Sequence, residues 1–233
     1  FSGAKWFIEG DIKGFFDNID HNVLIEILRE RILDERFLRL IRKFLNAGYL
    51  EEWQFNKTYS GTPQGGIVSP ILANIYLDKF DKFMEEYAQK FRKGTVRRRN
   101  KDICKLNNRV HYLKKRINEV KDAGKISAMI DELRTKQRQI LTMPSGADMD
   151  ENFRRLKYVR YADDFLIGVI GTKEECVKIK ADITHFMQEK LKLEMSQEKT
   201  LITNAQDYAK FLGYEICVRK DYSAQKNARG ERG

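Results

Sequence analysis

The sequence has few of the residues that build disulfide frameworks, zinc sites or membrane spans. Its three cysteines, Cys104, Cys176 and Cys217, are far apart and odd in number, so neither a disulfide framework nor a zinc-ligand spacing is indicated. A reducing intracellular compartment fits this cysteine usage. The apolar runs are too short to span a bilayer, and no signal peptide is visible. The chain begins with Phe1 rather than methionine, which suggests an excerpt of a longer protein.

The charge balance predicts a polyanionic partner. The chain has 233 residues, of which 42% are apolar, enough for the core of one large domain or of a domain with an insertion. Charged residues make up 33%, and the net charge is +10. Nucleic acid is the first partner class to expect, and a soluble domain with a basic surface is the alternative, because net charge bears on partners rather than on fold.

The positive charge is concentrated in one segment. Residues 88–157 hold 20 Lys and Arg against 8 Asp and Glu, so the rest of the chain is slightly acidic. Apolar residues recur at heptad-like spacing on both sides of a break at 122–125, which predicts an antiparallel helical hairpin over 100–141. We therefore expect a main domain from residues 1–87 and 156–219, a basic α-helical insertion at 88–155, and a flexible tail at 220–233.

Strand and helix signals alternate in the first part of the main domain. Residues 5–12 read as a strand that ends in a carboxylate, Asp11. Helices are expected to begin at Asp20 and at Asp34, both as capping residues. Ser69-Pro70 predicts a further helix, with the serine hydroxyl as its cap and proline in its first turn.

The last part of the main domain predicts a β-hairpin with carboxylates at its tip. Residues 156–161 and 164–170 are rich in β-branched and apolar residues and flank Asp163-Asp164. Thr172 is expected to cap the next helix, and short strands are expected near 199–203 and 211–218. The main domain is therefore predicted to be α+β.

Adjacent carboxylates at a turn suggest a metal site, but not by themselves. Asp163 and Asp164 repel one another unless a cation neutralises them, and Mg²⁺ prefers oxygen ligands. Asp11, at the end of another strand, can supply a third carboxylate for two ions that promote attack at phosphorus. The alternative is an ordinary turn, which aspartates favour.

Five motifs in order favour the metal site. They are FIEGDIKGFFDNIDH (7–21), GTPQGGIVSPILANIYLDKFD (61–81), YADD (161–164), SQEKT (196–200) and FLGY (211–214). This series resembles that of reverse transcriptases, specifically those encoded by group II introns, also called maturases.

The resemblance implies a fold and an activity. The fold would be the palm of a right-hand polymerase with partial fingers, an antiparallel sheet with helices on one face. The activity would be RNA-directed DNA synthesis with two Mg²⁺ ions, for which Mn²⁺ can substitute. The implied partners are an RNA template, intron RNA, a DNA primer and deoxynucleoside triphosphates, with no membrane. The implied location is the bacterial cytoplasm, or an organelle in a eukaryote.

The resemblance also assigns roles at the metal site. Asp11, Asp163 and Asp164 would be the metal-binding carboxylates, with Asp11 and Asp163 bridging both ions and Asp164 further away. The backbone carbonyl of Ile12 can add a ligand. Lys199 would lie near the leaving pyrophosphate, as a proton donor or a neutralising charge, or else be an exposed surface lysine.

Further roles concern the nucleotide and the primer. Phe15 would exclude a 2′-hydroxyl as a steric gate, whereas Phe16 is the weaker candidate and has core packing as its alternative. Gln64 and Gly65 would touch the incoming nucleotide, and Lys13 would contact the triphosphate unless it is a solvated lysine. The residues implied to steady or approach the primer are Phe211, Leu212, Gly213, Tyr161 and Arg160.

The basic insertion is expected to bind structured RNA through its phosphates. Its densest clusters are Arg97-Arg98-Arg99 and Lys114-Lys115-Arg116. The alternatives are a solvated helical face and a homodimer through the apolar stripes.

Two other functions stay open. One is a non-enzymatic intron RNA-binding splicing factor, and the other is a retron, diversity-generating or CRISPR-associated reverse transcriptase. The fingers motifs that family members carry upstream of Asp11 are not in this sequence, and no thumb or nuclease is evident, which puts independent activity of this exact chain in doubt.

Overall fold

The computed structural model describes residues 3–47, 49–51, 54–56, 61, 68–143, 146–147 and 149–218. These residues fall into two compact units, one formed by residues up to 92 together with 155–218, and one that includes 93–154. Gln64, Gly65 and the tail expected at 220–233 lie outside the described residues. No helix in the described ranges is long and apolar enough to cross a membrane.

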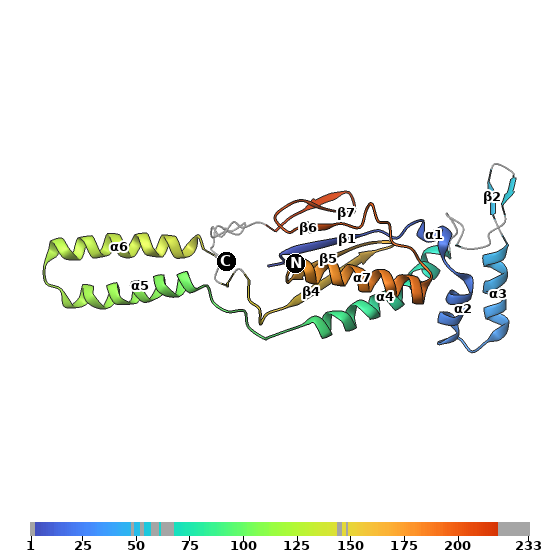
Figure 1. Ribbon diagram of the computed structural model, residues 1–233, viewed down its shortest axis with the longest axis horizontal. Coiled ribbons are helices and arrows are strands. Elements are labelled where there is room, and N and C mark those ends of the chain that lie inside the picture. Colours follow the sequence, from blue (N-terminus) through green and yellow to red (C-terminus); the bar gives the residue numbers. More distant parts are fainter. Residues whose placement is uncertain are drawn as a thin grey trace. The chain divides into compact units, whose positions relative to one another are not determined.

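A four-stranded antiparallel sheet forms the centre of the first unit (Figure 1). Its order is β4 (Arg155–Tyr161), β5 (Asp164–Ile170), β1 (Trp6–Gly10) and β6 (Ile202–Asn204). The register pairs Ile8 with Ile167 across β1 and β5. The strand from the start of the chain, β1, therefore lies between β5 and β6, which come from the later part of the chain.

Both faces of the sheet are buried, and side-chain alternation divides them between two clusters. Ile8, Phe165 and Ile167 belong to the larger cluster on the helical face. Phe7 and Leu166 point to the opposite face and belong to a smaller cluster. The central strands are therefore apolar almost throughout, as the runs in the sequence indicated.

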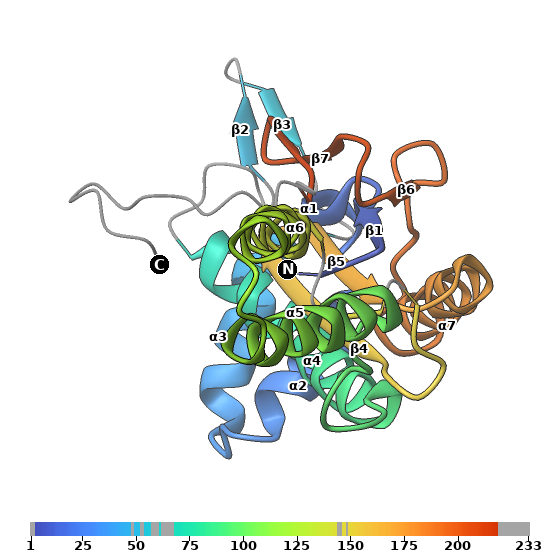
Figure 2. The ribbon, with the colours of Figure 1, turned by 90° about the vertical axis from the view of Figure 1, so that its left-hand side faces the viewer.

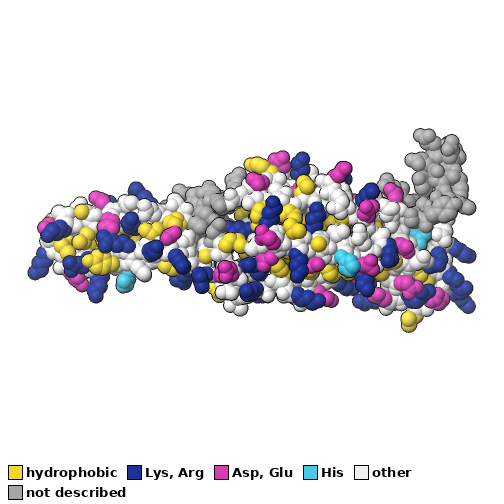
Figure 3. Space-filling model, viewed as in Figure 1, with side chains coloured by type: hydrophobic (Ala, Val, Ile, Leu, Met, Phe, Trp, Pro, Cys, Tyr) yellow, Lys and Arg dark blue, Asp and Glu magenta, His cyan; other side chains and the backbone are white. Residues whose placement is uncertain are grey.

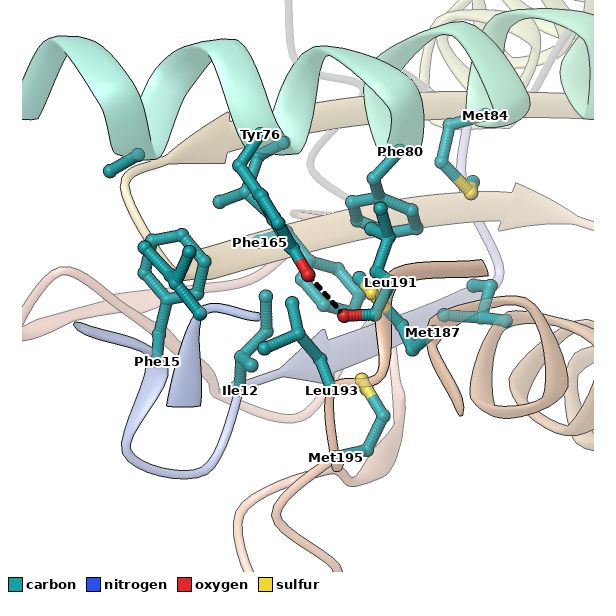
Figure 4. Close-up of a cluster of buried hydrophobic side chains, with 14 of the residues drawn as sticks. Ile12, Phe15, Tyr76, Phe80, Met84, Phe165, Met187, Leu191, Leu193 and Met195 are labelled. Carbon is teal, nitrogen blue, oxygen red and sulfur yellow. Dashed lines mark hydrogen bonds between the residues drawn. The ribbon is translucent and has the colours of Figure 1, made fainter. Parts of the chain in front are cut away.

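Two long helices, α4 (Ser69–Phe91) and α7 (Lys173–Leu191), cover one face. Figure 4 shows the core between them, where the Tyr76 hydroxyl donates to the Leu191 carbonyl at 2.5 Å. The capping box at Thr172 confirms the predicted start of α7. The predicted serine cap of α4 is wrong, because Val68 is the capping residue and Ser69 is already inside the helix and buried.

Three shorter helices and a hairpin follow β1: α1 (Phe15–Asn18), α2 (His21–Arg29), α3 (Glu35–Asn46), and the strands β2 (Tyr49–Glu51) and β3 (Gln54–Asn56). The caps expected of Asp20 and Asp34 are confirmed. Each carboxylate accepts hydrogen bonds from the backbone N–H groups of the second and third residues of its helix, as N-capping requires.

A second hairpin, β7 (Ala209–Phe211) and β8 (Tyr214–Ile216), lies on the face of the sheet opposite α4 and α7 (Figures 1 and 2). A single strand over 211–218 is therefore wrong, because Leu212 and Gly213 both have positive φ, 54° and 79°, and reverse the chain. The hairpin contributes Ala209 and Phe211 to the smaller apolar cluster.

The second unit contains the predicted helical hairpin, α5 (Lys101–Glu119) and α6 (Ala123–Leu141), side by side in Figures 1 and 2. Asp122 caps α6, and Arg109 donates to Glu132 at 2.8 Å across the pair. The α5 stripe buries Ile103, Val110 and Leu113 within this unit, and a homodimer through the apolar stripes stays a prediction. The predicted boundary at residue 88 falls inside the last turn of α4 and is too early.

The polymerase-palm expectation is confirmed in its architecture: an α+β unit whose antiparallel sheet carries helices on one face, interrupted by a basic helical hairpin. The β7–β8 hairpin covers part of the face opposite the helices, and Asp11 lines a cleft beside that hairpin.

Candidate active site

The register of β1 and β5 brings two of the predicted metal carboxylates together. Gly10 at the end of β1 pairs with Phe165 near the start of β5. Asp11 directly follows Gly10, and Asp164 directly precedes Phe165. This register puts Asp11 opposite Asp164, so the two side chains lie next to one another on one face of the sheet. The Asp11 side chain is only 17% exposed, so the two carboxylates meet in a partly desolvated position.

The electrostatics of this pair favour a bound cation. Burial raises the pKa of the Asp164 carboxyl, and the charges of Asp163 and Asp11 raise it further, while Lys199 opposes the shift. A divalent cation would remove this repulsion, and the two neighbouring carboxylates with substrate phosphates and water form the oxygen-rich ligand set that Mg²⁺ prefers. The residues present therefore fit a divalent metal.

Asp163 lies in the turn at the tip of the β4–β5 hairpin, as predicted. It shares this turn with Ala162, whose φ of 52° costs roughly 1–2 kcal/mol for a residue with a side chain. Within the described residues, no three His, Cys, Asp or Glu side chains gather closely enough to hold an ion. The pair brought together is thus Asp11 with Asp164, and the bridging role given to Asp163 stays a prediction.

Lys199 lies beside Asp11 because the loop after α7 is tied to β1. The backbone N–H of Ser196 donates to the Asp11 carbonyl at 2.9 Å, and the Lys180 side chain donates to the Thr200 carbonyl at 2.6 Å. Lys199 Nζ then lies 3.3 Å from Asp11 Oδ2, while the lysine remains 70% exposed. The lysine is therefore close to the carboxylates and still open to a ligand.

Ile12 and Lys13 continue from β1 into the same loop region. Ile12 is buried and forms an isolated bridge with Met195. Lys13 forms an exposed ion pair with Glu194 at 3.4 Å. The metal-ligand role of Ile12 and the triphosphate role of Lys13 both stay predictions.

A cleft of about 380 Å³ joins the carboxylates to the turn of the β7–β8 hairpin. Its lining includes Asp11, Asp164, Lys199 and the turn residues Phe211, Leu212 and Gly213. Glu9 also lines it, 7% exposed, where its carboxylate accepts from the Lys210 backbone N–H at 2.8 Å and from the Thr203 hydroxyl. Glu9 thereby fastens the hairpin to β1, a contact that sequence reasoning missed.

A second cavity, of about 300 Å³, lies beside the tip of the β4–β5 hairpin. Its lining includes Phe15, Phe16, Tyr161 and Ala162. Phe15 is the more deeply buried of the two phenylalanines, 1% exposed and packed against Tyr76 (Figure 4). Phe16 is only partly buried and packs against the larger core cluster. Core packing is therefore not specific to Phe16. Tyr161 is 68% exposed, and its contact with the primer stays a prediction.

The loop that carries Gln64 and Gly65 lies outside the described residues, but its first residue is placed. Gly61 donates its N–H to the Ile19 carbonyl at 2.8 Å, and its own carbonyl contacts His21 Nε2 at 2.7 Å. Gly61 has a φ of 85°, and an added Cβ would lie 2.3 Å from the Phe16 carbonyl oxygen. Glycine at this position lets the loop start directly against α1.

The Arg160 guanidinium points to α4, and its approach to a primer stays a prediction. It donates to Asp81 through Nε at 2.8 Å, and to the Ala162 carbonyl through Nη1 at 2.9 Å. Sequence reasoning missed Asp81. Its position was a usable signal, because Asp81 comes four residues after the buried Leu77 and so lies next to the apolar face of α4.

The basic residues assigned to RNA form two separate groups in the second unit. Arg97, Arg98 and Arg99 precede α5, whereas Lys114, Lys115 and Arg116 lie in its last two turns. Arg116 is paired with Glu119 at 3.4 Å. At 1.5 Å per residue, the two groups are about 20 Å apart along the helix. In Figure 3, Lys and Arg side chains are spread over both helices with acidic side chains between them.

Comparisons with known proteins agree with this geometry. The chain is 45% identical over 229 residues to the group II intron-encoded protein LtrA of Lactococcus lactis subsp. cremoris, covering 98% of this chain and 38% of that protein. It is 40% identical to the putative COX1/OXI3 intron 1 protein of Saccharomyces cerevisiae, covering 94% of this chain and 25% of that protein. The chain thus spans well under half the length of these relatives.

Solved structures and a family model give the fold and the family. The fold is similar to that of telomerase from Candida albicans, with a TM-score of 0.52 and 12% identity over 99% of this chain and 31% of that one. Telomerase from Candida tropicalis gives a TM-score of 0.51 and 14% identity over 91% and 34%. Residues 2–112 and 126–216 match the model "Reverse transcriptase (RNA-dependent DNA polymerase)". Members of that family generally use divalent metal ions, and this chain belongs to the reverse transcriptase family.

Proposed function

We propose that this chain is the catalytic palm of an RNA-directed DNA polymerase of the group II intron type, which copies RNA into cDNA. The observation that carries the proposal is the cleft in which Asp11, Asp164 and Lys199 meet the turn of the β7–β8 hairpin. Carboxylates at strand ends, with the exposed Lys199 ammonium beside them, suit the transfer of a nucleotidyl group. The similarity to the intron-encoded proteins supports the intron type.

Each residue has a task in this reaction. Asp11 and Asp164, with Asp163 in the adjoining turn, would hold two Mg²⁺ or Mn²⁺ ions, which activate the attacking hydroxyl and stabilise charge on the leaving group. Lys199 neutralises or protonates the leaving pyrophosphate. Leu212 and Gly213 hold the primer end over the carboxylates, and Phe15 meets the sugar of the incoming deoxynucleotide.

Primer extension on an RNA template tests the proposal, with the complete natural polypeptide and either deoxy- or ribonucleotides. Deoxynucleotides should be incorporated in strong preference. Asp164→Asn should abolish extension, whereas Asp78→Asn, an aspartate in an exposed ion pair on α4, should not change it. Equal extension by Asp164→Asn and the unmodified protein would exclude the assigned site.

The gate has a separate test. Phe15→Val should admit ribonucleotides while leaving deoxynucleotide addition measurable, because a smaller side chain leaves room for the 2′-hydroxyl. Phe15 is buried, so its thermal unfolding has to be compared with that of the unmodified protein. Phe16→Val provides the matched comparison. If only Phe16→Val admits ribonucleotides, the gate belongs to the more exposed ring.

A second function, intron RNA binding, is favoured by the second unit. Lys114 and Lys115 are exposed and lie at the far end of α5 from Arg97, Arg98 and Arg99. Each phosphate that they neutralise would steepen the salt dependence of binding. If primer extension fails and RNA binding persists, the splicing-factor role is the better description. The location follows the host, the cytoplasm of a bacterium or an organelle of a eukaryote.

Filter binding of intron RNA at several salt concentrations tests this role. Replacing Lys114 and Lys115 with glutamine should lower affinity and reduce the log–log salt slope by about 1 to 2. The control replaces Lys105 and Lys125, which are paired with Asp102 and Asp122 on the same hairpin. An unchanged slope in the first variant, or an equal change in both, would contradict the assignment.

A further inference from the structure

The β4–β5 turn that carries the aspartate pair is held from behind by one guanidinium. Arg160, on β4, points to the helical side of the sheet, away from the cleft that contains Asp11 and Asp164. Its Nη1 donates to the carbonyl of Ala162 at 2.9 Å. Ala162 is the first residue of the turn, has a φ of 52°, and is followed directly by Asp163 and Asp164.

The guanidinium is itself fixed by α4. Asp81 accepts two hydrogen bonds from Arg160, one from Nε at 2.8 Å and one from Nη2 at 2.5 Å. Asp81 also accepts from the Tyr158 hydroxyl at 2.8 Å, and the Asn74 side-chain oxygen lies 3.3 Å from Arg160 Nη1. The Arg160 side chain is only 9% exposed. A two-pronged carboxylate pair of this kind fixes the plane of the guanidinium.

The pairing keeps Arg160 charged and in place. Hydrogen bonding to Asp81 raises the pKa of the Arg160 guanidinium. Burial and the hydrogen bond to Asp81 likewise raise the pKa of the Tyr158 hydroxyl, which keeps it a donor. Lysine could reach Asp81 or the Ala162 carbonyl, but its single nitrogen cannot hold both in a fixed plane.

We propose that Arg160, anchored by Asp81, is a positioning residue that sets the backbone of the Ala162–Asp163 turn and thereby places the catalytic carboxylates against Asp11. This inference rests on the proposed polymerase function. It assigns Arg160 no contact with substrate. Its effect passes through the turn, so it should appear in the rate of nucleotide addition and in the metal requirement, and not in nucleotide affinity.

The test compares Arg160→Lys and Asp81→Asn with Lys82→Ala in the complete natural polypeptide. Lys82 is the matched control because it belongs to an exposed ion pair with Asp78 on the same helix. Both test variants should lower kcat by about 10- to 100-fold, because small misplacements of reacting groups have effects of this size. They should also raise the Mg²⁺ concentration for half-maximal rate, with KM for the deoxynucleotide changed less than about threefold. Lys82→Ala should match the unmodified protein.

Hydrogen exchange gives a readout that needs no activity. In Arg160→Lys, the amides of residues 162–165 should exchange at least about tenfold faster, while those in the middle of β5 stay unchanged. If the unmodified protein does not extend primers but this local change occurs, the proposed function fails and the positioning role stands. If Arg160→Lys has the kcat, Mg²⁺ dependence and exchange of the unmodified protein, the positioning role is overturned. Faster exchange throughout β4 and β5 would also overturn it, by showing a general role in folding.

Discussion

Gly10 should not tolerate even a methyl group, although it lies in an ordinary strand. An added Cβ would lie 2.1 Å from Cζ of Phe165 and 2.3 Å from its Cε2. Carbon atoms in contact are normally about 3.5–4.0 Å apart, so the ring or the strand would have to move by roughly 1.5 Å. Phe165 is 1% exposed and packs against Phe80, with ring centroids 5.1 Å apart. The Phe165 ring is therefore surrounded by packed side chains and has no free space into which it could move.

The expected magnitude follows from this geometry. Overpacking a filled core costs about 1–3 kcal/mol, so Gly10→Ala should lower the free energy of unfolding by that amount in urea denaturation. Gly10 is followed by Asp11, and its partner Phe165 is preceded by Asp164. Parting the strands here moves the two carboxylates, and a shift of about 1 Å can lower the rate about 100-fold. Primer extension should therefore fall more than stability alone explains.

A double variant and a control make the prediction specific. Phe165→Leu removes the atoms that clash, so Gly10→Ala combined with Phe165→Leu should be more stable than the two single changes predict by about 1–2 kcal/mol. Gly124→Ala is the control, because its added Cβ would meet only Asp122 Oδ1 at 3.4 Å. It should be neutral or stabilising by up to about 1 kcal/mol. Strict additivity, or a Gly10→Ala protein with unchanged stability and activity, would refute the reasoning.

Three further outcomes follow from described contacts. Glu9→Gln should raise KM for the primer several-fold with KM for the nucleotide unchanged, because the charged acceptor of the Lys210 N–H holds the hairpin; an unaltered primer KM would argue against this. Tyr76→Phe should lower the free energy of unfolding by about 1–2 kcal/mol with little change in kcat, because it leaves the buried Leu191 carbonyl without its donor. The raised pKa of Asp164 means that folding favours its protonated form, so its contribution to stability is complete below the ordinary aspartate pKa of about 3.9 and is lost as the pH rises through the raised pKa. Calorimetry without metal should show this loss as a difference from Asp164→Asn, and added Mg²⁺ should reverse it; identical pH profiles would exclude the effect.

Local features of this protein could be predicted from the sequence because short-range chemistry decides them. Asp20, Asp34 and Thr172 cap helices as expected, since a side-chain oxygen needs only the next few N–H groups as partners. The helical hairpin over 100–141 could be predicted because apolar residues recur at heptad-like spacing on both sides of the break at 122–125. Ser69 shows the limit, because burial at that position placed it inside α4 and left Val68 as the cap.

The sequence by itself therefore pointed to the family, to the main helices and central strands, and to the candidate carboxylates, because motif order and periodicity are written along the chain. Only the tertiary structure decided how those groups meet. The strand register places Asp164 opposite Asp11. Arg160 reaches Asp81 across 79 positions of sequence. Such contacts depend on sheet register and helix docking, in which distant side chains compete for the same partners, and no local pattern records the outcome.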